Sequence, residues 1–213
     1  MFGRCPLPLT CVLAVSPHVI SAVSLLRVIP DAMNLDALNL AEQELLSRVQ
    51  RVTGLMEEKH SQLQQSGVYA EYGKIYEAYV QLIKSENEGL EALKRSIFLL
   101  WYEQAEPSCF SGLFGLSEIA SQKVFSYLER RAEAEDLDFE LKWMLPYYDM
   151  IAEWMFDKCS NIPNLQAFLA TSDSNSFEKL GIKSEDFVGR GQMGNYWTSV
   201  LNSNAVRFNE NAS

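Results

Sequence analysis

Residues 69–106 read YAEYGKIYEAYVQLIKSENEGLEALKRSIFLLWYEQAE and carry the longest helical pattern in the chain. Apolar side chains recur along it at alternating spacings of three and four, with Glu86 filling the one gap in the series. The series is Tyr72, Tyr76, Tyr79, Ile83, Leu90, Leu93, Ile97 and Leu100. This period predicts one α-helix with a single buried stripe, about 55 Å long if unbroken. Because so long an amphipathic helix is marginal alone, it needs partner helices along that stripe.

A second stretch, residues 34–66, repeats the same pattern. Its apolar series is Leu38, Leu45, Val49, Val52, Met56 and Leu63. Glu42 and Lys59 occupy the remaining positions of this seam, where polar residues can fix the register of paired helices. Only a short link ending in Gly67 separates the two stretches, so the helices are predicted to be antiparallel neighbours. The sequence therefore predicts an all-α fold: an antiparallel hairpin of long helices, about 34–66 and 69–106, with coiled-coil-like pairing, covered by shorter helices.

The rest of the chain supplies the covering helices. Residues 117–135 and 137–159 each carry helical spacing, and Pro146 predicts a kink next to it in the second of them. Beyond residue 181 the chain is rich in Gly, Asn and Ser, which predicts mostly irregular structure and a frayed tail. The expected organisation is a helical domain over 33–181 and a C-terminal segment over 182–213.

Residues 1–32 differ in composition from the rest of the chain. Between Arg4 and Arg27 no residue carries a formal charge. Three interpretations are open: a signal peptide, a membrane anchor, or an upstream extension of a chain whose true start is Met33. The third is preferred, because prolines interrupt the uncharged run and a soluble helix begins directly after Met33. It predicts a cytoplasmic protein; an exported or membrane-anchored protein is the alternative if residues 1–32 belong to the mature chain.

The charge balance limits the classes of partner. The chain has 213 residues, a formal net charge of -10 and 47% hydrophobic residues. This composition is typical of a globular protein, and it argues against binding to nucleic acid or anionic membranes, which requires patches of Lys and Arg. It favours a neutral or basic partner. A membrane contact is expected only if residues 1–32 are a true anchor.

The usual patterns of catalytic and metal sites are missing from the sequence. Glu57 and His60 form one ExxH pattern, but a di-iron helical bundle needs that pattern twice. A thiol nucleophile, Cys109 or Cys159, would need His60 as its base. GxGxxG occurs over 189–194, but a dinucleotide-binding turn follows a strand within a βαβ unit, so this one is interpreted as a flexible turn. His60 is interpreted as an exposed polar residue, and no cofactor, metal ion or catalytic residue is predicted.

The most suggestive feature is both acidic and aromatic. Three carboxylates recur every four residues in the last predicted helix, so they form one stripe on its surface. Tryptophans lie in the same helix and at the end of the long helix. Aromatic side chains beside carboxylates suit the capture of an Arg- or Lys-rich segment. The predicted partner-binding residues are Asp149, Glu153, Asp157, Trp101, Trp143 and Trp154.

Two functional hypotheses follow, and a third depends on residues 1–32. The first is a non-catalytic acidic helical module that binds a basic protein partner; an immunity or antitoxin-like protein that masks a cationic enzyme is one version. The second is an enzyme or ligand carrier with an aromatic pocket between helices, lined by Trp101, Trp143, Tyr148 and Trp154. The third is a membrane-tethered or exported helical protein. The missing catalytic motifs favour the first, so an enzyme is the less favoured class.

Overall fold

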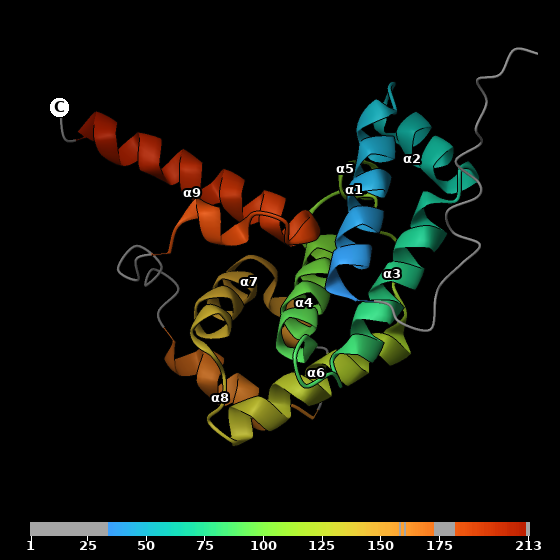
Figure 1. Cartoon of the computed structure of the whole chain (residues 1–213). Helices are drawn as coiled ribbons and strands as arrows, with labels where there is room; N and C mark the ends of the chain where they lie inside the picture. The colour runs from blue at the N-terminus through green and yellow to red at the C-terminus, as the bar shows by residue number, and fades with distance from the viewer. Residues whose placement is uncertain (1–33, 158, 160, 173–181, 212–213) are drawn as a thin grey trace, which may run out of the picture. The chain divides into compact units, whose positions relative to one another are not determined.

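The computed structural model describes residues 34–157, 159, 161–172 and 182–211 (Figure 1). Every regular element in these ranges is a helix, so the predicted all-α class is confirmed. The elements are α1 (Leu35–Arg51), α2 (Met56–Gln65), α3 (Val68–Leu82), α4 (Gly89–Ala105), α5 (Ser108–Ser111), α6 (Glu118–Glu133), α7 (Phe139–Asp157), α8 (Pro163–Thr171), the 3-10 helix η3 (Ser184–Phe187) and α9 (Gly191–Asn211). None of these helices combines the length and the apolar composition needed to cross a membrane. The interpretations of residues 1–32 lie outside the described residues.

Each of the two long helical stretches is interrupted once. The first breaks after α1, where Val52 is extended and Gly54 adopts a φ of 118° that favours glycine. The second breaks between α3 and α4, where residues 84–88 read KSENE and contain no apolar side chain to continue the buried stripe. Ile83 and Leu90, on either side of the second break, pack against the core. Met56, after the first break, is 49% exposed, which corrects its place in the predicted buried series.

Helices α1 and α3 lie side by side and run in opposite directions (Figure 1). The Leu35 N–H at the start of α1 donates to Glu88 Oε1 beyond the end of α3, at 3.1 Å. Near the end of α1, Arg48 Nη1 donates to Glu71 Oε2 in the first turn of α3, at 2.8 Å. This arrangement remains compatible with the predicted hairpin, now built from four helices.

Helix α4 forms the centre of the core. All its residues from Ala92 to Trp101 are buried, and it contacts α3, α5, α6, α7 and α9. A helix that is covered on all sides must be mostly apolar around its whole circumference, and residues 92–101 of α4 read ALKRSIFLLW. Two of these buried residues, Lys94 and Arg95, are nevertheless cations. Those two cations need partners, and the partners come from distant parts of the chain.

The C-terminal segment corrects the prediction of irregular structure after residue 181. Helix α9 begins at Gly191 and packs against α1, α4 and η3, with Met193 and Trp197 each 1% exposed. Gly189 and Gly191 have φ values of 78° and 62°, so glycine supplies the turn that starts the helix. The GxGxxG pattern is thus an ordered helix-starting turn and not a flexible one.

Helix α7 also differs in detail from its prediction. The helix continues through Pro146, which is buried, and the backbone departs from helical geometry at Ala152, with φ -141° and ψ 56°. The deviation therefore lies six residues after the proline and divides the part of α7 that carries the acidic stripe.

Candidate functional site

The acidic stripe lies on the C-terminal half of α7. Glu153 and Asp157 are exposed and Asp149 is half-buried. Among the described residues, no Lys or Arg forms an ion pair with any of the three. Partial burial raises the pKa of Asp149, and the negative charges of Asp157 and Glu153 raise it further. The three carboxylates are therefore close enough for their charges to interact, although the deviation at Ala152 lies between Asp149 and Glu153.

Two large apolar side chains flank this stripe. Met150 is 57% exposed and Trp154 is 44% exposed, and each directly follows a carboxylate of the stripe in sequence. We call the five residues Asp149, Met150, Glu153, Trp154 and Asp157 the α7 surface. It combines an accessible indole ring with three carboxylates that have no ion-pair partner among the described residues.

The other two predicted tryptophans do not belong to this surface. Trp101 and Trp143 are 1% and 3% exposed, so they are corrected to core residues. The Trp101 ring stacks on Tyr148 with centroids 4.6 Å apart, and the Trp143 ring lies 4.3 Å from that of Trp197. Trp197 Nε1 also donates to the Tyr148 hydroxyl at 3.1 Å. These rings pack on one another, so they fill the place where the second hypothesis put an aromatic pocket.

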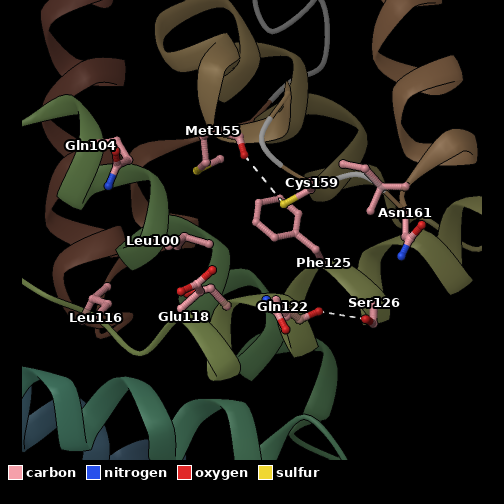
Figure 2. Close-up of a pocket in the computed structure, with 12 residues that line it drawn as sticks. Leu100, Gln104, Leu116, Glu118, Gln122, Phe125, Ser126, Met155, Cys159 and Asn161 are labelled. Atoms are coloured by element: carbon pink, nitrogen blue, oxygen red, sulfur yellow. Dashed lines mark hydrogen bonds between the residues drawn. The ribbon is translucent and has the colours of Figure 1, made fainter.

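A groove of about 540 Å³ lies elsewhere, between α4, α6 and the end of α7 (Figure 2). It is lined by Leu100, Gln104, Leu116, Glu118, Ser121, Gln122, Phe125, Ser126, Met155, Cys159, Asn161 and Ile162. Gln104 and Leu116 lie toward one end in Figure 2, and Asn161 and Ser126 toward the other. Its volume is in the usual range of ligand-binding clefts.

The groove has an apolar floor and a polar wall. Leu100, Phe125 and Met155 supply apolar surface, whereas amides and hydroxyls come from α6 and its neighbours. Among the described residues, the lining contains one carboxylate, Glu118, and no Lys or Arg. The Cys159 thiol donates to the Met155 carbonyl at 3.9 Å, and burial raises its pKa, so the reactive thiolate form is disfavoured. The groove is therefore suited to binding and not to thiol chemistry.

His60 is half-buried, which corrects its interpretation as an exposed residue. Its Nδ1 lies 3.0 Å from Ser108 Oγ and 3.0 Å from the Tyr69 hydroxyl. The Tyr69 hydroxyl also donates to Ser108 Oγ at 3.4 Å. His60, Tyr69 and Ser108 therefore lie within hydrogen-bond distance of one another, and this cluster joins α2, α3 and α5. Cys109, the thiol considered with His60, is buried.

Sequence reasoning missed a partly buried ionic cluster centred on Arg190, just before α9. Its guanidinium donates to both oxygens of Glu91 in α4 and of Glu140 in α7, at 2.5–2.8 Å. Lys94 pairs with Glu140 and Asp138. Burial opposes ionisation of Glu140, but hydrogen bonds from Arg190 and Lys94 lower its pKa to about 2. The cluster fixes the C-terminal segment to α4 and α7.

Glu42 provides a second attachment for α9. Its carboxylate, 1% exposed, accepts a hydrogen bond from the Gln192 N–H, and Asn39 Oδ1 accepts one from the Gly191 N–H at 2.8 Å. Burial raises the pKa of Glu42, although the Gln192 N–H and the Tyr79 hydroxyl act in the opposite direction. Two side chains of α1 thus cap the first turn of α9. Glu42 had been predicted only as a polar residue of the seam.

In the part of the chain that the structure describes, no group of three or more His, Cys, Asp or Glu side chains is arranged to hold a metal ion. Comparison of the sequence and structure with protein-family models, curated proteins and solved structures finds no match. The function must therefore be argued from the α7 surface and the groove.

Proposed function

We propose that the protein is a non-catalytic binding module whose α7 surface takes a Lys- or Arg-rich segment of a protein partner. The observation that carries this proposal is the acidic stripe of Asp149, Glu153 and Asp157, which has no ion-pair partner among the described residues and lies beside an exposed tryptophan. A cation can pair with the stripe while its stem or a neighbouring cation lies against the face of Trp154. Burial is the larger cause of the raised pKa of Asp149, and the negative charges of Asp157 and Glu153 add to it; a bound cation would relieve this mutual repulsion.

The free energies of the individual contacts indicate how much the α7 surface can contribute to binding. Three exposed ion pairs contribute at most about 1 kcal/mol each, and a cation on Trp154 about 1 kcal/mol more. The sum, about 4 kcal/mol, corresponds to a dissociation constant of about 1 mM. The α7 surface therefore selects a basic partner and makes binding sensitive to salt, whereas tight binding requires apolar contacts as well.

Masking of a cationic enzyme, as by an immunity or antitoxin-like protein, is one role that uses this chemistry. Such a role needs fast electrostatic capture and a rigid acidic face, and α7 is held to α4 through Glu140 and Lys94. The enzyme hypothesis has less support, because the tryptophans that were to line its pocket pack on one another.

The test is a peptide-display selection on the purified protein, followed by affinity measurements on the selected peptides. We expect the peptides to be enriched in Lys and Arg. The charge reversal D149K/E153K/D157K should then weaken their binding at least about tenfold, because it removes about 1.4 kcal/mol or more of attraction. The control E57K/E77K/E86K alters net charge equally at exposed positions in α2, in α3 and in the turn between α3 and α4. Equal losses in both triple variants would show an effect of net charge alone and would overturn the proposal.

A further inference from the structure

We propose that the groove between α4, α6 and α7 binds the same partner segment, and that this segment carries apolar residues bordered by Lys or Arg. This inference rests on the proposed function and specifies the partner's sequence. It assigns the apolar contacts to the groove and the cationic contacts to the α7 surface.

The two surfaces adjoin through the C-terminal end of α7. Met155 lines the groove, and its neighbour Trp154 belongs to the α7 surface. Cys159 lines the groove two residues after Asp157, so the Cα atoms of these two residues are at most about 7 Å apart. One short segment can therefore contact the groove and the acidic stripe together.

The length of the groove fits a short extended peptide. Its α6 wall runs from Glu118 to Ser126, a rise of about 12 Å along the helix. An extended chain covers that length with about three or four residues. Gln104, Gln122 and Asn161 carry amide groups that can both donate to and accept from a peptide backbone, while Phe125 and Met155 offer apolar surface to its side chains.

The charge of the groove matches the same occupant. Glu118 is exposed at the groove and, within the described ranges, has no ion-pair partner. Glu118 lines the groove from α6, Asp157 lies two residues before the lining residue Cys159, and none of the described lining residues is cationic. An apolar segment bordered by Lys or Arg complements this pattern, whereas an acidic segment would be repelled.

The experiment uses the peptides selected on the full-length protein and a variant that fills the groove. Gln122→Trp places an indole in the groove from an exposed position of α6, and Gln81→Trp is its control at an exposed position of α3. We expect an apolar residue within the Lys/Arg cluster of the selected peptides. Q122W should weaken their binding about 10- to 100-fold, the value of one buried apolar side chain, with little change in salt dependence. Q81W should bind like the wild type.

A change in the peptide keeps the test independent of folding in the variant. Replacing the apolar residue of a selected peptide with serine should weaken its binding to the wild-type protein by a similar factor and leave its binding to Q122W almost unchanged. Basic peptides without an apolar position, or equal binding by Q122W and the wild type, would overturn the groove assignment and leave the proposed function standing. Selected peptides without Lys/Arg enrichment would overturn the proposed function itself.

Discussion

Replacing Arg190 with methionine tests how the C-terminal segment is held. The side chain of Arg190 is 12% exposed and donates four hydrogen bonds to Glu91 and Glu140. Removing one partner of a fully buried ion pair costs about 3–5 kcal/mol. The Glu91 and Glu140 side chains are each 22% exposed, so water compensates their charges in part and the lower end of this range applies. Since Lys94 and Arg95 still neutralise the two carboxylates in part, we expect a cost of about 3 kcal/mol for R190M.

The assay is equilibrium unfolding in urea followed by tryptophan fluorescence, with Trp197 of α9 as one of the buried reporters. For a slope of about 2 kcal/mol per molar urea, the midpoint of R190M should fall by about 1.5 M. The control is R131M, since Arg131 pairs with Asp136 at the surface and should contribute less than about 1 kcal/mol. A midpoint for R190M equal to that of R131M would refute the argument that the Arg190 cluster stabilises the fold.

Three further predictions concern the same region. The folded-state pKa of Glu140, about 2, lies below its usual 4.5, so its stabilising contribution is present at neutral pH and is lost as the pH falls through this interval. It amounts to about 3 kcal/mol, and E140Q should flatten the acid side of a stability curve measured by urea titration. The pKa of Glu42 is raised, so its contribution is present at low pH and is lost as the pH rises through the folded-state value. E42Q, which keeps an acceptor for the Gln192 N–H, should be at least as stable as the wild type at pH 8, and a clear loss there would contradict this assignment. G191A places a methyl group against the Glu42 carboxylate at a φ of 62°, and should cost more than about 2 kcal/mol in thermal or urea unfolding. G115A has a similar φ of 72° with open space around it, and should cost only about 1 kcal/mol.

The fold class was predictable because helix formation follows the spacing of apolar residues. Leu45 and Leu93 are buried as the period predicts, at 3% and 0% exposure. The interruptions at residues 52–55 and 83–88 were harder to see, because the apolar period resumes in register after each of them. In the sequence, Gly54 indicated the first interruption, and the polar run KSENE at residues 84–88 indicated the second.

Helix α9 was missed because its first turn is rich in glycine, which lowers helix propensity. A signal was present nonetheless: Met193, Trp197 and Leu201 recur at a spacing of four, and the first two are fully buried. The attachment of this helix could not be predicted, since Glu42 and Gln192 are 150 residues apart and nothing in the local sequence pairs them.

The acidic stripe was predictable for the same reason as the helices, whereas the tryptophans were not. Helical spacing places Asp149, Glu153 and Asp157 on one side of α7, but it does not say which side faces water. Trp143 lies one and a half turns before Asp149 and is covered by Trp197 from α9, a helix that the sequence had not predicted. The groove depends on contacts between α4, α6 and α7 and leaves no pattern in the sequence.

The most direct test of the central claim is a titration of the isotope-labelled protein with a selected basic peptide, followed through backbone amide chemical shifts. The account predicts that the largest shifts fall on residues 149–157, extend to the α6 wall of the groove, and shrink as salt is added. Largest shifts on α2 and α5, or shifts on α7 that are unchanged by salt, would contradict it.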